Sequence, residues 1–479
     1  MRLDIRDIVT KNKLVLLIFF LAALVRVYKL PEFTTFLSDQ GRDAIIVRNI
    51  VTLKHWPAIG APSSVGQVYL GPFYYYLIAP FLLLFNFNPA GLAFGAAFLS
   101  LIGIIAGYLV TRKEVGKLTA VLFLVFTAFS FENIEQSRFS WNPNLLPFFA
   151  FFTLYFFYKL MKTNKMIFAI LLGAFLSFSV QLHYLAVFLT LTIILFAVTD
   201  RKLVSKLLKY LVAVISFLLF SLPLVIFDLR HQFLNSKNFL TLFKNGIVSG
   251  SSLSARFLDT IQVFFSTVLT FKINPLAALL ILALLAAGYF LLNKKDSNLW
   301  IKINLLNVVT FLLFFAFMNA SRLPHYFGPI YLSLFLVTAY YIANAKLNRF
   351  LIILLVLLYV GINVPHYYFF YQKGSNQIAH SQKVADFLAT KINHQPFNIA
   401  TWPVQLTEDN FVYFLELKGL VPANRQKAEI TNQMFVLCDQ EPCEILNSPS
   451  WNISMFGPAK IDNIWKVDGI KIYKLIHNK

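Results

Sequence analysis

The chain has 479 residues, of which 58% are hydrophobic and 52 are phenylalanine. Its repeated apolar runs, each near the length that crosses a bilayer, exclude an ordinary soluble protein and indicate a polytopic membrane protein. The formal net charge of +20 does not indicate nucleic-acid binding, because the basic residues lie in short loops between the apolar runs.

The first apolar run begins at Leu14 after a basic segment and is followed by no small-residue cleavage site. We therefore expect it to stay as an anchor and not to be removed as a signal peptide. The pattern predicts eleven spans, near residues 14–28, 91–110, 117–131, 143–161, 166–181, 184–199, 208–227, 275–292, 300–318, 327–343 and 349–366.

Basic residues in alternate loops predict which ends of the spans face the cytoplasm. They are Arg2, Arg6, Lys11 and Lys13 at the N-terminus, then Arg112, Lys113, Lys117, Lys159, Lys162, Lys165, Arg201, Lys202, Lys206, Lys209, Lys294, Lys295, Lys302, Lys346 and Arg349. We expect a plasma-membrane protein with its N-terminus in the cytoplasm. A full span at residues 71–85 would invert this alternation, so we expect a re-entrant or interfacial helix there, broken by Pro72 and Pro80.

Three segments are expected on the outer side: residues 29–90, 132–143 and 228–274, the last with a surface helix over 254–271. Residues 1–370 form the expected membrane domain. Past it the chain becomes more polar, and a helical stretch at 379–392 with strand-like runs at 397–401, 433–438 and 470–476 predicts a small extracytoplasmic α/β domain over 373–479. Cys438 and Cys443 form either a disulfide or two ordinary thiols.

The segment SDQGRDA, residues 38–44, places two carboxylates at the predicted outer mouth of the bundle. Ionised groups next to hydrocarbon are costly and usually mark a functional site. Asp39 opens an amphipathic helix predicted over residues 40–54, and Asp43 follows one turn later on the same face. In the alternative interpretation Asp39 or Ser38 caps the helix, and Asp43 pairs with Arg42 or Arg48.

If both carboxylates of this segment are ionised, a cation has to lie nearby or one pKa has to rise. Arg42 is about a hundred degrees around the helix from Asp43. We therefore expect the balancing cation to come from a facing loop.

A first span ending in VRVYKL, an Asp that opens an amphipathic helix and a Gly-Pro-aromatic run resemble the GT-C superfamily, whose polytopic transferases use polyprenyl-phosphate sugars. The resemblance covers about residues 10–370 and is to the branch of the protein O-mannosyltransferases and the lipid A aminoarabinose transferase. That branch commonly has Asp-Glu where this chain has Asp39-Gln40. Its His/Lys-Pro-Pro-aromatic motif is replaced by Gly71-Pro72 and the aromatic run to Tyr76.

The resemblance implies a glycosyltransferase that moves a sugar from a polyprenyl-phosphate donor to an extracytoplasmic protein, lipid or glycan. It also implies that Asp39 is the general base that takes the proton of the acceptor hydroxyl, with Asp43 in support. A positioned base contributes about 10²–10⁴-fold to a rate. The alternative function is a transporter or lipid-linked sugar flippase, but neither an internal repeat nor an acidic residue in the middle of a span favours it.

The phosphate of such a donor needs cationic or hydrogen-bonding partners. Candidates at the predicted outer ends of spans are Arg138, His183, Arg322 and His325. The alternative is that each is an interfacial anchor or a satisfied residue of the bundle. Tyr74 and Tyr75 are candidates for stacking on the sugar, although interfacial belts use the same residue types.

Several relatives carry a second acidic motif that helps to bind a divalent metal. This chain has Trp141-Asn142-Pro143-Asn144 at that place, with Glu132 and Glu135 before it. Amide oxygens supply no charge, so we expect no tightly held metal and assign no metal ligand. In the alternative, Glu132 or Glu135 supplies a carboxylate to a divalent metal if the end of its helix turns inward.

Overall fold

The computed structural model describes residues 13–63, 68–199, 203–246, 252–292, 298–318, 321–403, 407–446 and 448–478. Several basic residues used to predict sidedness lie outside these ranges, namely Arg2, Arg6, Lys11, Arg201, Lys202, Lys294 and Lys295.

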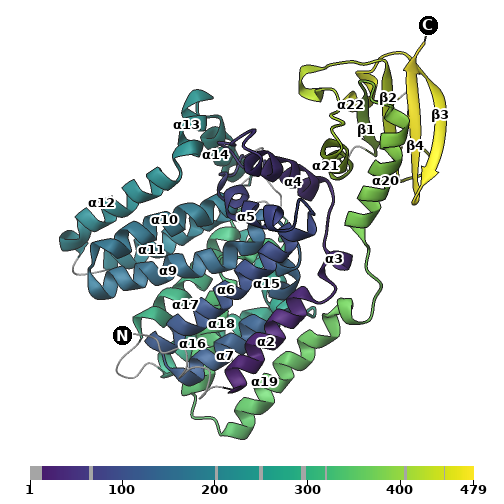
Figure 1. Cartoon of the computed structure of the whole chain (residues 1–479). Helices are drawn as coiled ribbons and strands as arrows, with labels where there is room; N and C mark the ends of the chain where they lie inside the picture. The colour runs from purple at the N-terminus through teal and green to yellow at the C-terminus, as the bar shows by residue number, and fades with distance from the viewer. Residues whose placement is uncertain are drawn as a thin grey trace.

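Every predicted span coincides with a helix of the membrane domain (Figure 1). The helices are α2 (Lys13–Val27), α6 (Ala90–Glu114), α7 (Lys117–Phe129), α9 (Leu146–Thr163), α10 (Met166–Leu182), α11 (Phe188–Thr199), α12 (Leu203–Phe220), α16 (Pro275–Leu292), α17 (Leu299–Phe315), α18 (Tyr331–Asn344) and α19 (Arg349–Asn363). Within the described ranges, three helices are by themselves long and apolar enough to cross a membrane, or five if each of two bent pairs is one span. The number of eleven spans therefore stays a prediction.

Contacts bring the predicted cytoplasmic loops together at one end of the bundle. Glu114, at the end of α6, accepts hydrogen bonds from Lys159 and Lys162, each at 3.0 Å. Asn298, just before α17, donates to the Glu114 carbonyl oxygen at 3.1 Å. These three loops therefore lie at the same end of the bundle, as the charge pattern predicts, whereas the alternation of the other loops and the side of the membrane that each end faces stay predictions.

At the other end, α3 (Leu30–Phe33), α4 (Ser38–Val51) and α5 (Phe73–Leu84) form the first outer segment. The amphipathic helix α4 begins two residues earlier than predicted, with Leu37 at the N-cap position, so neither Ser38 nor Asp39 caps it. The prediction that Pro80 breaks the next helix was wrong, because α5 continues through Pro80 to Leu84. A proline removes one helical hydrogen bond, and packing of α5 between α4 and α6 keeps the helix intact.

The other two segments predicted to be outer are also helical, with α8 (Phe131–Ser137) in the first and α14 (Leu234–Gly246) and α15 (Leu253–Leu269) in the second. Helix α13 (Leu222–Arg230) begins inside the predicted span over residues 208–227 and ends in the second of these segments. The predicted surface helix over residues 254–271 corresponds to α15. One face of α15, including Ile261 and Phe264, is buried against the bundle.

The C-terminal domain begins with α20 (Gln377–Ile392) and contains a four-stranded sheet in the order β1-β2-β4-β3. Its elements are β1 (Asn398–Trp402), α21 (Asp409–Leu417), β2 (Gln433–Cys438), α22 (Trp451–Ser454), β3 (Ala459–Val467) and β4 (Ile470–His477). Strands β1 and β2 are parallel, and the other neighbours are antiparallel. Cys438 and Cys443 form a disulfide.

The C-terminal domain packs on α4 through α21 (Figure 1). A Cβ atom on Gly41 would lie 2.2 Å from the backbone nitrogen of Asn410, so the helices approach this closely only because residue 41 is glycine. Arg48 forms an ion pair with Glu416 at the other end of the contact. The helix that carries Asp39 is therefore held between the membrane domain and the C-terminal domain.

Candidate active site

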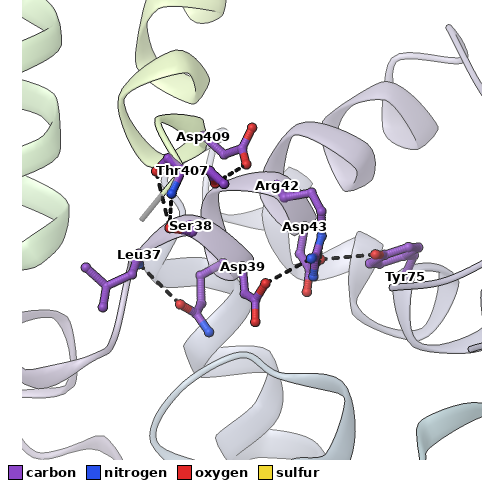
Figure 2. A network of polar contacts seen from close by, with 9 residues as sticks. Leu37, Ser38, Asp39, Arg42, Asp43, Tyr75, Thr407 and Asp409 are labelled. Carbon is purple, nitrogen blue, oxygen red and sulfur yellow. Dashed lines mark hydrogen bonds and ion pairs between the residues drawn. The ribbon is translucent and has the colours of Figure 1, made fainter. Parts of the chain in front are cut away.

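Arg42 joins the two carboxylates of α4 (Figure 2). Its Nη1 lies 2.9 Å from Oδ1 of Asp39, and its Nη2 lies 2.8 Å from Oδ1 of Asp43. The expectation of a cation from a facing loop was wrong. The long Arg42 side chain reaches both acids along its own helix, because a guanidinium presents several N–H donors in a fork.

The two carboxylates differ in their surroundings. The side chain of Asp39 is 51% exposed, whereas that of Asp43 is 2% exposed. The Tyr75 hydroxyl donates to Oδ1 of Asp43 at 3.1 Å. Burial raises the pKa of the Asp43 carboxyl, and the Arg42 guanidinium beside it opposes this rise. Asp43 therefore anchors Arg42, and Arg42 orients the accessible carboxylate of Asp39.

Asp39 and Arg42 line a cavity of about 330 Å³ that also contains two of the predicted phosphate-binding residues, His183 and His325. His183 ends α10, and His325 lies in the short helix η3 (Pro324–Phe327). The centroids of the two imidazole rings are 5.8 Å apart. Trp141, Tyr184 and Tyr326 complete the aromatic wall of this cavity, a role that their individual positions in the sequence do not indicate.

Burial lowers the pKa of His183 to about 3 and that of His325 to about 4. Both imidazoles are therefore neutral near neutral pH. Nδ1 of His183 accepts a hydrogen bond from the Leu185 backbone at 3.3 Å, which leaves the proton of the neutral ring on Nε2. The histidines bring hydrogen-bonding groups to the cavity, and the cation beside Asp39 is Arg42.

The other two basic candidates lie elsewhere. Arg138 donates to the carbonyl oxygens of Val25 at 2.8 Å and Tyr28 at 2.9 Å, and lies over the Phe369 ring. Arg322 donates to the Thr260 hydroxyl at 3.1 Å. The expected convergence of four residues thus brings only the two histidines to the cavity, while the two arginines contact other parts of the bundle.

The tyrosine candidates lie beneath α4. The Tyr74 hydroxyl shares a hydrogen bond with Ser140 at 2.7 Å, and Tyr75 contacts Asp43 as described. Both side chains are buried, and neither lines the cavity beside Asp39. Their positions fit support of α4 better than contact with a ligand in that cavity.

The acidic residues near the Asn-Pro-Asn segment are engaged within the protein. Glu132 accepts from Gln136 at 2.6 Å, and Glu135 accepts from the Tyr368 hydroxyl at 2.8 Å. In the part of the chain that the structure describes, no three His, Cys, Asp or Glu side chains are grouped to hold a metal ion. The donor set does not fit a metal, so we derive no step through one.

The helical bundle, the helix α4 and the small C-terminal sheet define a mostly helical fold with a small α/β domain at its C-terminal end. The family model described as dolichyl-phosphate-mannose-protein mannosyltransferase matches residues 70–226. The crystal structure of ArnT from Cupriavidus metallidurans bound to undecaprenyl phosphate is similar, with a TM-score of 0.64 and 12% identity. The alignment covers 97% of this chain and 98% of that one.

The structure of the same ArnT in the apo state gives a TM-score of 0.60 with 14% identity, and again 97% and 98% of the two chains are covered. No curated protein matches the sequence. The family match and the fold confirm the resemblance to the PMT-like branch of the GT-C glycosyltransferases.

Arg42→Gln tests the ion pair in the site, because it leaves the buried Asp43 without its cation. We expect it to lower the free energy of unfolding by about 3–5 kcal/mol. Since burial holds the pKa of Asp43 above its unfolded value, the folded state of the variant binds more protons, and stability should fall as pH rises from 5 to 8. Thermal unfolding of the purified protein at both pH values measures this.

The double variant Arg42→Gln/Asp43→Asn leaves no unpaired buried charge at position 43 and should regain most of the lost stability at pH 8. Lys418→Gln, which breaks the half-exposed pair with Asp386, is the matched control and should change stability by less than about 1 kcal/mol. A double variant as unstable as Arg42→Gln would contradict the assigned ion pair.

Proposed function

We propose that this protein is a membrane glycosyltransferase that moves a sugar from a polyprenyl-phosphate donor to the hydroxyl group of an extracytoplasmic acceptor. The observation that carries the proposal is the accessible carboxylate of Asp39, oriented by Arg42, on a cavity shared with His183 and His325. The family match to a dolichyl-phosphate-mannose transferase and the fold of an ArnT that binds undecaprenyl phosphate support it.

In the proposed reaction the acceptor oxygen bonds to the anomeric carbon as the bond from that carbon to the phosphate oxygen breaks. The acceptor proton passes to Asp39, and the polyprenyl phosphate leaves with one more negative charge. N–H groups of His183 and His325 are suited to donate to the phosphate oxygens as this charge develops. The acceptor class is a protein, a lipid or a glycan.

The position of the cavity favours transfer over transport. Its described lining comes from residues 39, 42, 61–63, 70, 141–143, 183–184, 323 and 325–326, all in segments at the end of the bundle that we propose faces outward. A transporter or flippase needs a site that opens in turn to both sides, usually near the middle of the membrane.

Asp39→Asn tests the general base. The side chain keeps its size but loses its basicity, so we expect transfer to fall by about 10²–10⁴-fold while the thermal unfolding temperature changes little. The assay uses purified enzyme in vesicles with radiolabelled polyprenyl-phosphate sugar and a membrane extract as acceptor. Asp462→Asn on the exposed strand β3 is the control, and wild-type transfer by Asp39→Asn would refute the role.

The proposed location of the site requires the C-terminal domain to be extracytoplasmic. The disulfide between Cys438 and Cys443 gives a direct test, since these are the two cysteines of the chain. After reduction of intact cells, a membrane-impermeant maleimide should label both. Labelling only after permeabilisation would reverse the predicted orientation.

A further inference from the structure

A second cavity, of about 320 Å³, lies between the C-terminal domain and the start of α4. It is bounded by the carboxyl ends of the parallel strands β1 and β2, at Trp402 and Asp439, and by the turn at Asp468 between β3 and β4. In open α/β sheets, ligands commonly bind in the crevice outside the carboxyl ends of parallel strands. The volume lies within the range of small-molecule sites.

The lining combines aromatic surfaces with fixed polar groups. Trp402, Phe411 and Phe36 provide the aromatic part. Among the polar groups, Nδ1 of His380 lies 2.7 Å from Oδ2 of Asp468. An aromatic surface beside a few oriented polar groups suits a ligand with an apolar face and many hydroxyl groups.

The charge of the lining separates this cavity from the one beside Asp39. Among its described lining residues are Asp439 and Asp468 but neither Lys nor Arg, although the whole chain has a net charge of +20. Lys383 lies outside the lining and pairs with Asp468 at 2.7 Å. A phosphate group would therefore meet the carboxylate of Asp439 here, whereas a neutral saccharide would find hydrogen-bond acceptors. The chemistry therefore favours an uncharged sugar over the phosphate of the donor.

Consecutive residues in the first turn of α4 line the two cavities. Ser38 lines the cavity under the C-terminal domain, and the next residue, Asp39, lines the proposed donor cavity. The Ser38 hydroxyl accepts from the Thr407 backbone nitrogen at 2.7 Å (Figure 2), and Thr407 also lines the second cavity. A ligand held here would lie next to the helix that carries the proposed base.

We propose that this cavity is a saccharide subsite for the acceptor, in which Trp402 stacks on a sugar ring and Asp439 accepts hydrogen bonds from its hydroxyls. The assignment to the acceptor rests on the proposed function, whereas saccharide binding itself does not. A sugar bound here would direct the growing end of a glycan, or the sugar headgroup of a lipid, toward Asp39.

Saturation-transfer difference NMR on the full chain in lipid nanodiscs, free of sugar-based detergent, tests this subsite. The probes are the methyl glycosides of glucose, mannose, galactose and N-acetylglucosamine. We expect at least one to receive saturation, and Trp402→Leu to reduce its apparent affinity by about tenfold or more through loss of stacking. Asp439→Asn, a change at an exposed position, should weaken binding without affecting folding.

Trp451→Leu is the matched control, because Trp451 is an exposed tryptophan of α22 in the same domain and does not line the cavity. The subsite is refuted if no glycoside receives saturation, if Trp451→Leu weakens binding as much as Trp402→Leu, or if Trp402 is required for a serine-containing tripeptide and not for any glycoside.

The test separates the subsite from the proposed function. Asp39→Asn should bind the glycoside like the wild type while losing transfer. If Asp39→Asn keeps transfer and Trp402→Leu still loses glycoside binding, the general base is wrong and the saccharide subsite stands.

Discussion

The bridge from Arg42 to Asp39 and Asp43 is the interaction on which the proposed site depends. Asp43 is buried, and its Oδ1 accepts hydrogen bonds from both the Arg42 guanidinium and the Tyr75 hydroxyl. Asp43 therefore fixes the position of the guanidinium. The same guanidinium also forms an ion pair with the half-exposed carboxylate of Asp39. One cation therefore neutralises a buried acid and orients an accessible one, which divides two chemically identical side chains into an anchor and a candidate base.

The bridge in turn depends on how α4 is held. From the membrane side, Tyr74 and Tyr75 of α5 place hydroxyl groups beneath it. From the other side, α21 approaches so closely that Gly41 has no room for a Cβ atom. Among its described residues, the C-terminal domain supplies no group to the cavity beside Asp39. It does cover the helix that supplies Asp39, and it lines a second cavity together with Ser38, the residue before Asp39.

The sequence predicted those features of the fold that depend on residues close together in the chain. Long apolar runs formed helices, so all the predicted spans were found as helices. The acidic segment at 38–44 lies at one end of the bundle, as its position after the first apolar run predicts. Strand β3 was missed because it is an exposed edge with Asp462, Asn463 and two lysines, and it lacks the apolar alternation that marks a half-buried strand. Arg138 was misplaced because its partners, the carbonyls at the end of α2, lie more than a hundred residues away in the sequence and give no local signal.

The proposed reaction requires polyprenyl phosphate to bind in the cavity between Asp39 and the two histidines. A cryo-EM structure of the full chain in nanodiscs with undecaprenyl phosphate added would test it most directly. We expect density for the phosphate within hydrogen-bonding distance of His183 and His325, with Asp39 facing it and still paired with Arg42. Phosphate density bound instead at Arg138 or Arg322, with the cavity beside Asp39 empty, would contradict it.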